Sequence, residues 1–531
     1  MSEAFFQRLL RHYALDEEGF RALAQEPSFS SIPKLDAANP SLAKAKERLV
    51  KAKETGEKVL IYGDYDVDGI SSASIMTMVL RKMGLSPAYY LPSRYRDGYG
   101  INLENAKKIA AKGYSLVVTV DNGVSAHEPI AYLAAHGADT IIIDHHEIPE
   151  QGAPKEAILI HPDVLHYGEY AISAGFLSFL FSRYLLGEDD PYFESLAGLS
   201  TLSDMMPLMG YNRVAVRLAL SFLNEKRFLP FFYYLQKEKI DYSDLSFSFI
   251  PALNALGRMR ENPAEIRCAV SYFADPWSEK SERFAGWLHA VNDQKKRAVG
   301  EAASKLTIDS SAAAIVSVGA LPEGLNGLFA NRLLTQYEKP VAVFSPKNGE
   351  PGVLVGSLRA KEGFSIIDVE REMGDILLQS GGHELAGGAS IKEEELPSFR
   401  NFFLRYAEAH PFLPEKEDVI PLEEGEVTLE NSEILSQFAP FGEGWKEPKF
   451  LLRLPASRLL FSQRGYLSLR LSNGGTVFSF SLTQSSFSLP QNGSVSLKGR
   501  LSVNEFHGAR SARFLADEAE KGVLPLEEEG R

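Results

Sequence analysis

The chain has 531 residues, of which 44% are hydrophobic, and it carries a formal net charge of −14 at pH 7. This length predicts two to four domains, and because no apolar run reaches about 18 residues, no transmembrane span is expected. The one cysteine, Cys268, argues against a disulfide framework and a multi-cysteine zinc site. The negative charge argues against a general nucleic-acid coat protein but leaves room for a local basic channel. The charged N-terminus has no signal-peptide pattern, so a cytoplasmic location is expected.

A predicted helical lead-in, residues 1–50, precedes the most informative stretch of the sequence. The apolar run Val59–Tyr62 stops at a glycine, which is typical of a buried strand in a parallel sheet, and Asp64, Asp66 and Asp68 follow it. Ligands of open α/β sheets bind outside the carboxyl ends of the strands. Three carboxylates this close repel one another unless a cation lies among them. A divalent-metal site is therefore favoured over a solvated acidic turn, and the Glu and helix pair of an EF-hand calcium loop are not visible.

The next segment predicts a helix over residues 72–83 and a short strand over residues 88–91. The loop that follows, residues 92–102, places Arg94 and Arg96 among tyrosines and glycines. These arginines either cradle an anionic substrate or belong to a loop that packs on its tyrosines. Both interpretations remain open from the sequence.

Two further predicted strands, residues 116–120 and 140–143, end at Asp121 and Asp144. Three strands that each end at an aspartate are what a composite metal site at the edge of a parallel sheet requires. The alternation of strands and helices predicts a doubly wound α/β domain.

Asp144 is followed by two adjacent histidines, His145 and His146. Adjacent side chains diverge in a turn, so one imidazole is expected to face metal and the other the substrate, although a packed or surface histidine is the commoner case. A predicted small-residue helix in residues 196–208 runs up to Asp204. A buried, unpaired aspartate is costly, so Asp204 either binds metal or caps the next helix.

The predicted secondary structure changes along the rest of the chain. Residues 265–307 predict helices, and residues 308–417 predict a second α/β domain with a flexible, glycine-dense turn at residues 381–388. From residue 418 short alternating strands, with a hairpin at residues 473–475, predict a small β-barrel. Its candidates for strand binding are Arg464, Arg470, Lys498, Arg500, Arg510 and Arg513, and a barrel that contacts no DNA is the alternative. The expected domains are the lead-in (1–50), the catalytic domain (51–264), the helical connector (265–307), the second α/β domain (308–417) and the barrel (418–531).

Eight motifs, taken together, resemble the DHH phosphoesterase superfamily and, within it, the bacterial RecJ family of single-stranded-DNA-specific exonucleases. The motifs are YGDYDVDG (62–69), VDNG (120–123), IDHH (143–146), SDMMPL (203–208), LNALGRM (253–259), GSLR (356–359), GGHELAGG (381–388) and PFGEG (440–444). The resemblance implies a DHH domain, a DHH-associated domain and an oligonucleotide/oligosaccharide-binding (OB) fold. RecJ relatives commonly carry Asn-Pro where this chain has His161-Pro162.

The same resemblance implies roles for particular residues. Two manganese or magnesium ions would be bound by Asp66, Asp68, Asp121, His145 and Asp204, with Asp64 joining or supporting them. Asp144 would orient these ligands, and His146 would meet the scissile phosphate. The terminal 5′-phosphate would be held by Arg258, Ser357, Arg359, Gly381, Gly382 and His383. Hard carboxylates with one imidazole independently suit manganese or magnesium, and two such ions suit phosphodiester hydrolysis.

The function expected from the sequence is a metal-dependent exonuclease that degrades single-stranded DNA from the 5′ end to mononucleotides, in DNA repair and recombination. Its expected partner is single-stranded DNA, and a single-strand-binding protein and a helicase are candidate partners. No association with a membrane is expected, and the chain is expected to be a monomer. Two alternatives stay open. One is a DHH phosphodiesterase of short oligonucleotides or cyclic dinucleotides, and the other is an inactive scaffold that binds single strands.

Overall fold

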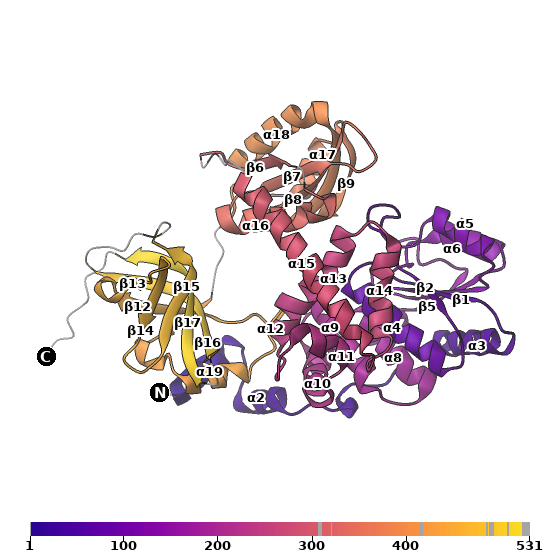
Figure 1. Cartoon of the computed structure of the whole chain (residues 1–531), viewed down its shortest axis with the longest axis horizontal. Coiled ribbons are helices and arrows are strands. Elements are labelled where there is room, and N and C mark those ends of the chain that lie inside the picture. Colours follow the sequence, from indigo (N-terminus) through magenta and orange to yellow (C-terminus); the bar gives the residue numbers. More distant parts are fainter. Residues whose placement is uncertain are drawn as a thin grey trace. The chain divides into compact units, whose positions relative to one another are not determined.

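The computed structural model of the chain describes residues 2–305, 309, 311–319, 321–413, 418–484, 487, 493–506 and 509–522 (Figure 1). The chain divides into two compact units, one of residues 28–414 and one that joins residues 1–27 to residues 415–531. Within the described residues, no helix combines the length and apolar character that crossing a membrane needs.

The first sheet of the larger unit is fully parallel and has the strand order β2-β1-β3-β4-β5. Its strands are β1 (Val59–Tyr62), β2 (Ala88–Tyr90), β3 (Leu116–Val120), β4 (Asp139–Ile143) and β5 (Ala157–Ile160). The chain leaves β1 for β2 on one side and returns to β3 on the other, which makes the carboxyl ends of β1 and β3 the switch point where ligands bind in such sheets. The predicted doubly wound α/β domain is confirmed.

Helices cover both faces of this sheet because successive side chains of each buried strand point to opposite faces. Val59 and Ile61 of β1 belong to one hydrophobic cluster, and Leu60 and Tyr62 belong to another. The first cluster includes residues of α4, α8 and α9, and the second includes residues of α5 and α6 (Figure 1). The helices of this region are α3 (Pro40–Glu54), α4 (Val67–Lys82), α5 (Leu103–Ala111), α6 (His127–Ala135), α7 (Pro162–Leu165), α8 (Ala174–Leu186), α9 (Pro191–Ser203) and α10 (Gly210–Lys226).

A run of helices continues the larger unit beyond α10. It comprises α11 (Leu229–Leu235), α12 (Tyr242–Asp244), a π-helical turn η2 (Leu245–Phe249), α13 (Ile250–Met259), α14 (Pro263–Phe273) and α15 (Lys280–Lys305). The helices expected over residues 265–307 correspond to α14 and α15.

The second sheet of the larger unit has the order β6-β7-β8-β10-β9, with β6 and β7 parallel and the other pairs antiparallel. The glycine-dense turn expected at residues 381–388 is wrong, because Gly381 and Gly382 lie in β9 and Gly387 and Gly388 in β10. The elements are β6 (Ile315–Val318), α16 (Asn326–Tyr337), β7 (Val341–Pro346), β8 (Val353–Arg359), α17 (Ile366–Glu372), β9 (Leu377–His383), β10 (Ala386–Lys392) and α18 (Leu396–Ala409).

The smaller unit is built on a seven-stranded sheet of order β11-β12-β16-β17-β15-β14-β13. The predicted hairpin at residues 473–475 joins β14 to β15. The elements are β11 (Val419–Leu422), α19 (Leu429–Ser436), β12 (Lys449–Pro455), β13 (Leu460–Phe461), β14 (Tyr466–Arg470), β15 (Thr476–Thr483), β16 (Ser494–Phe506) and β17 (Ala509–Gly522).

The first two helices of the chain, α1 (Ser2–His12) and α2 (Glu17–Ala24), belong to this smaller unit. Phe5 is fully buried, and its ring lies 5.7 Å from that of Phe450 on β12. Tyr13 stacks on Trp445 with 4.3 Å between ring centroids. The amphipathic N-terminus therefore buries its apolar face against the C-terminal sheet domain.

Candidate metal centre and anion pocket

The acidic loop after β1 is shaped by the start of α4. Asp66 is the N-cap of this helix and accepts a hydrogen bond from Gly69 N at 3.1 Å, so the helix begins at Val67, before the predicted Ser72. A Cβ on Gly69 would lie 2.5 Å from Asp64 N, so a side chain there would displace the loop. The three alternating aspartates thus arise from a strand end, a helix cap and the first helical turn.

Asp68 is 1% exposed and is held by donors from two other helices. Its carboxylate accepts from Ala174 N at 2.9 Å and Gly175 N at 2.7 Å, both in the first turn of α8, and from the Ser200 hydroxyl on α9. The N-terminus of α8 and the Ser200 hydroxyl therefore fix the direction of the Asp68 carboxylate.

His145 is the point at which three carboxylates from different elements converge. Its Nε2 lies 3.6 Å from Asp68 Oδ2, 3.3 Å from Asp121 Oδ1 and 3.4 Å from Asp204 Oδ2. Asp121 follows β3, and Asp204 is the C-cap of α9. Burial lowers the pKa of His145, which favours the neutral imidazole with a lone pair free to bind a cation.

The predicted metal ligands all come together at this edge of the sheet. Two groups that share no residue each place their ligand atoms within 4.8 Å of one another. They are Asp64, Asp66 and Asp121 in one group, and Asp68, His145 and Asp204 in the other. Asp64 Oδ1 and His145 Nε2 are buried without a hydrogen-bond partner in the described part of the chain. This oxygen-rich set with one imidazole fits two hard divalent ions of the manganese or magnesium class.

The electrostatics of the cluster indicate a missing positive charge. Burial and neighbouring carboxylates raise the pKa of Asp64 and of Asp121 well above the ordinary value. Burial, followed by the charges of Asp68 and Asp66, raises the pKa of Asp204 to about 8. Without a cation the group holds protons at neutral pH, and a bound divalent ion would remove that cost.

Asp144 is fully buried and orients the two histidines through hydrogen bonds. It accepts hydrogen bonds from Val124 N at 3.0 Å, His145 N at 2.8 Å and His146 Nδ1 at 2.8 Å. Burial acts to raise the pKa of Asp144, but the hydrogen bond from His146 and its charge outweigh it and lower the pKa. Burial acts to lower the pKa of His146, but the hydrogen bond to Asp144 and the charges of Asp144, Asp204 and Asp68 together outweigh it and raise the pKa, so His146 favours the imidazolium form.

Tyr99 is a site residue that the sequence did not single out. Its hydroxyl donates to Asp121 O at 3.1 Å and lies 3.1 Å from His146 Nε2. The sequence singled out the loop of residues 92–102, but it did not distinguish a tyrosine at the site from one that only packs in the loop.

His161, where relatives carry asparagine, accepts from Asp163 N with Nδ1 and donates from Nε2 to His146 O at 2.9 Å. One imidazole thus supplies the acceptor and the donor that an asparagine would.

A small pocket of about 140 Å³ adjoins the carboxylate cluster. Arg94 lies over the ring of Tyr65 at 4.8 Å, and Arg258 donates to Gly324 O at 3.4 Å. Burial, followed by the charge of Arg94, lowers the pKa of Arg258 to about 10. The pocket is lined by Tyr65, Asp66, Arg94, Ser203, Asn254, Gly257 and Arg258.

A third arginine, Arg359, extends this cationic region onto the second sheet. Its Nη1 donates to Leu358 O at 2.7 Å, and a Cβ on Gly327 would lie 2.9 Å from its Nη2. Gly327 is in the first turn of α16, so the start of that helix lies close to Arg359 and Ser357. Among the residues described, none of Arg94, Arg258 and Arg359 forms an ion pair with a carboxylate. Three uncompensated guanidinium groups indicate an anion site, and we call the small pocket together with the adjoining Arg359 the anion pocket.

Strand register separates the remaining predicted substrate residues. Arg359 pairs with Ala386, which pairs with His383, and Ser357 pairs with Gly388, which pairs with Gly381. Directly paired residues face the same side of a sheet, so His383 and the open surface of Gly381 share the face of Ser357 and Arg359. Gly382 pairs with Gly387, where a Cβ would lie 2.4 Å from Glu370 Oε1 of α17. The structure therefore places Gly382 on the opposite face, away from the anion pocket.

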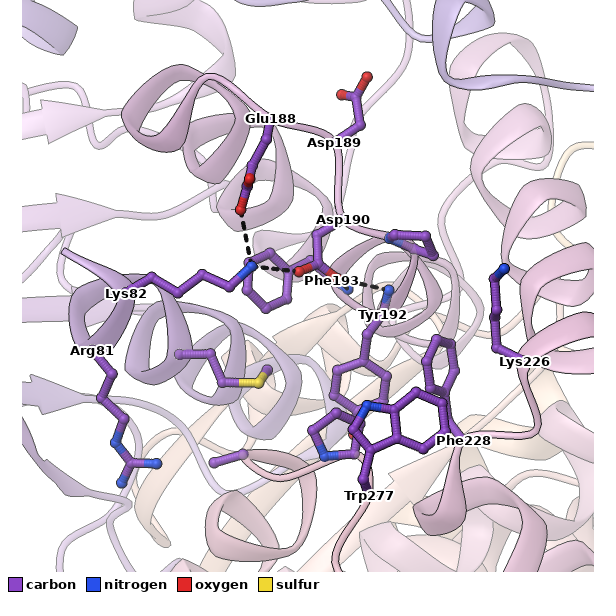
Figure 2. A pocket seen from close by; sticks show the side chains of 14 residues that line it. Arg81, Lys82, Glu188, Asp189, Asp190, Tyr192, Phe193, Lys226, Phe228 and Trp277 are labelled. Atoms are coloured by element: carbon purple, nitrogen blue, oxygen red, sulfur yellow. Dashed lines mark hydrogen bonds and ion pairs between the residues drawn. The ribbon is translucent and has the colours of Figure 1, made fainter.

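A larger cavity of about 640 Å³ lies at the other ends of the two site helices, at the C-terminus of α4 and the N-terminus of α9 (Figure 2). Three of its charged side chains pair with each other: Lys82 Nζ lies 3.0 Å from Glu188 Oε1 and 2.8 Å from Asp190 Oδ2. Asp190 also caps α9 by accepting from Tyr192 N. These three side chains compensate one another, unlike the buried carboxylates of the cluster, so the cluster and not this cavity is the candidate site.

Comparison with known proteins agrees with this geometry. The sequence model of the DHH family, N-terminal domain, matches residues 58–190, that of the DHHA1 domain matches residues 313–409, and that of the RecJ OB domain matches residues 420–518. Residues 58–190 belong to the DHH family. The family expected from the eight motifs is thus confirmed, and the DHH match contains the acidic loop and both histidines.

Similar DHH-family proteins include single-stranded-DNA-specific exonuclease RecJ of Bacillus subtilis, 26% identical over 90% of this chain, and RecJ of Escherichia coli, 28% identical over 89%. The chain spans 63% of the length of the Bacillus relative and 89% of the Escherichia one. The crystal structure of RecJ with Mn²⁺ from Thermus thermophilus has a TM-score of 0.79, covers 98% of this chain and 78% of its own, and is 24% identical. This likeness confirms the predicted fold, including the C-terminal OB domain.

Proposed function

We propose that the chain is a metal-dependent exonuclease that hydrolyses single-stranded DNA from the 5′ end to mononucleotides, in DNA repair and recombination. The observation that carries the proposal is a buried cluster of carboxylates with one imidazole, beside three guanidinium groups that form no ion pair with a carboxylate of the described residues. A cation site next to an anion site is what cleavage of a terminal phosphodiester needs. The relatives named as single-stranded-DNA-specific exonucleases support the choice of substrate.

The cofactors we propose are two divalent ions, Mn²⁺ or Mg²⁺, held by the two groups around Asp121 and His145. Such ions supply an activated water and charge neutralisation for the attacking and leaving oxygens. The chain's own part is to fix the ligands: α8 holds Asp68, and Asp144 holds the backbone of His145. Asp64, with a free buried oxygen, completes the set.

His146 is proposed to contact the scissile phosphate. Its side chain is 42% exposed at the rim of the cluster, and Asp144 favours its imidazolium form. A positive imidazolium in this position would bind a phosphate oxygen and stabilise charge that develops in the transition state. Tyr99, bonded to the same ring, would limit its rotation.

The anion pocket is proposed to hold the terminal 5′-phosphate. Arg258 and Arg359 offer planar donor groups for bidentate contacts, while Ser357 adds a hydroxyl donor. His383 and Gly381 would border the strand on the same sheet face, and Gly382 would act through the packing of α17. Fixing the 5′ end at a set distance from the metal ligands would make single nucleotides the product.

The OB domain is proposed to bind the strand farther from its end. Phe478 and Phe480 lie 4.8 Å apart on β15, Tyr466 lies 6.0 Å from Phe478, and Arg513 lies over Phe478. Phe480 is 66% exposed, as a platform for base stacking requires. Arg500 and Arg510 are less suited to this role, because they pair with carboxylates of their own domain. Arg464 and Arg470 are exposed and remain candidates.

The setting proposed for this activity follows from its substrate. Single strands must be supplied by a strand-separating enzyme, so a helicase and a single-strand-binding protein are proposed partners of a cytoplasmic monomer. The relatives' names specify single-stranded DNA, which supports the need for such a supply.

Digestion of a single-stranded oligonucleotide labelled at either end tests the proposal. The arms are the wild type with Mn²⁺, the wild type with chelator, Asp121→Ala, and Asp375→Ala as a matched control, because Asp375 is an exposed carboxylate on the second sheet domain. Stepwise loss from the 5′ end, abolished by chelator and by Asp121→Ala alone, is expected. Cleavage confined to very short oligomers would favour the small-substrate phosphodiesterase, and binding without cleavage would favour the scaffold.

A further inference from the structure

Helix α9 ends in a Schellman motif at the metal centre. Asp204 is its C-cap, Met206 N donates to Thr201 O at 3.1 Å, and Met205 N donates to Leu202 O at 3.4 Å. These are the two hydrogen bonds that define the motif, and they place Met205 at the position that requires a left-handed backbone. Its φ is +51°.

A methionine is an unfavourable residue for this position. Glycine is the usual occupant because a Cβ crowds the backbone in the left-handed region. The Met205 side chain does not offset that cost by burial, since the residue is 69% exposed. The stability of the fold therefore does not explain a long apolar side chain here.

The location of Met205 suggests what the side chain does. Its preceding neighbour is Asp204, whose Oδ2 lies 3.4 Å from His145 Nε2. The residue before that, Ser203, lines the small pocket that contains Arg94 and Arg258. Met205 is thus adjacent in the chain to one residue of the carboxylate cluster and close to one of the anion pocket, and its exposed side chain is available to a strand bound there.

We propose that Met205 packs against the base of a nucleotide that adjoins the scissile phosphate and so positions that phosphate at the metal ligands. The inference rests on the proposed exonuclease function. The unbranched, polarizable thioether of methionine packs on aromatic rings without reading base edges. A contact of this kind positions the chain end equally for all four bases, as an enzyme that degrades any sequence requires.

The test is Met205→Gly, compared on two 5′-phosphorylated single strands. One strand carries all its bases, and the other carries tetrahydrofuran abasic residues at its first two positions. Glycine suits the left-handed backbone, so the variant should fold at least as stably as the wild type, with an unlowered Tm. Its kcat/KM on the normal strand should fall about three- to tenfold, the size of a lost thioether–ring contact. On the abasic strand the variant and the wild type should be equal.

Glu338→Gly is the matched control, because Glu338 also ends a helix with a φ of +51° and lies on the second sheet domain. It should alter neither strand's kinetics. Met205→Leu, which keeps an apolar side chain, should retain most of the activity. Unchanged kinetics of Met205→Gly on the normal strand, or an equal loss on both strands, would overturn the assignment. Failure of the proposed function would appear separately, as a wild type that leaves both strands intact with Mn²⁺.

Discussion

Replacing Ser200 with alanine should weaken metal binding without touching a metal ligand. The Ser200 hydroxyl donates to Asp68 Oδ1 and lies 2.6 Å from Ser173 Oγ, in a fully buried position on α9. Asp68 is close to His145 and is one of the proposed ligands. Removing the hydroxyl frees one carboxylate lone pair from a hydrogen bond and loosens the orientation of the carboxylate.

The size of the effect on metal affinity follows from the hydrogen bonds that Asp68 keeps in the variant. Asp68 keeps its bonds from Ala174 N and Gly175 N, so its burial is still compensated. Loss of one outer partner of a metal ligand costs about 10- to 100-fold in metal affinity. With two of three donors intact, we expect the lower end, about a tenfold higher Mn²⁺ requirement, which corresponds to about 1.4 kcal/mol. Saturating Mn²⁺ should restore most of the rate.

The assay is a Mn²⁺ titration of strand degradation, with calorimetric titration of Mn²⁺ as an activity-independent measure. Thr201→Ala is the matched control: Thr201 is the next residue and is equally buried, but its hydroxyl donates to the helix carbonyl of Ala197 at 2.8 Å. That variant should lose stability and keep the wild-type Mn²⁺ requirement. The reasoning is refuted if Ser200→Ala has an unchanged Mn²⁺ requirement, or if Thr201→Ala shifts it equally.

Three further outcomes are expected. The pKa of Asp204 is raised from the ordinary 3.8 to about 8 in the folded protein, so the metal-free protein should lose stability as the pH rises between these values, while its apparent affinity for Mn²⁺ increases. Thermal unfolding at pH 6 and pH 8, with chelator and with Mn²⁺, measures both effects. A Tm that does not change with pH contradicts the prediction. Burial raises the pKa of Glu194, and its two carboxyl oxygens have no hydrogen-bond partner among the described residues. Glu194→Leu should therefore raise the free energy of unfolding, measured in urea, by about 1–3 kcal/mol, and a destabilised variant would contradict this. Phe480→Ala should weaken single-strand binding about five- to 100-fold, measured by fluorescence anisotropy against exposed Leu460→Ala as a control, and equal losses would argue against stacking.

Much of the candidate metal centre was predictable because its residues follow a simple rule. Asp121 and Asp144 come directly after a buried parallel strand, Asp64 comes one residue later, and the ends of such strands meet at one edge. Asp204 was harder, since an aspartate at a helix end is also a common cap. Its convergence with His145 depends on how α9 packs against α4, which local sequence does not encode.

The residues that sequence reasoning missed act through tertiary packing. Ser200 reaches Asp68 only because α9 lies against α4 and α8, and Tyr99 reaches His146 through a loop without regular structure. The packing partner of α1 was equally hidden: an amphipathic helix reveals its apolar face but not the surface that covers it.

The error at the glycine-rich motif has a physical cause as well. A high glycine content is typical of turns, but glycine also permits close approach of two elements. Gly387 lies in β10 where a Cβ would strike Glu370 and Ile366 of α17, so a strand and a helix meet at that point. Gly381 has nothing within 4 Å of its Cβ position and leaves the other sheet face bare.

The carboxylate cluster and the nearby arginines carry opposite charges but do not form ion pairs with each other. Arg94 lies over the ring of Tyr65, and Arg258 donates to a carbonyl, although buried carboxylates are close enough for their charges to act on both arginines. Direct ion pairs would have neutralised the acids and the arginines together and left neither for a ligand. Because the carboxylates and the arginines do not pair, the carboxylates can bind cations and the arginines can bind a phosphate. A bound cation reduces the repulsion between the carboxylates and the phosphate, and a bound phosphate reduces the repulsion between the arginines and the cation. Mn²⁺ and a 5′-phosphorylated strand should therefore bind with positive coupling, so that each raises the affinity of the other by the same factor.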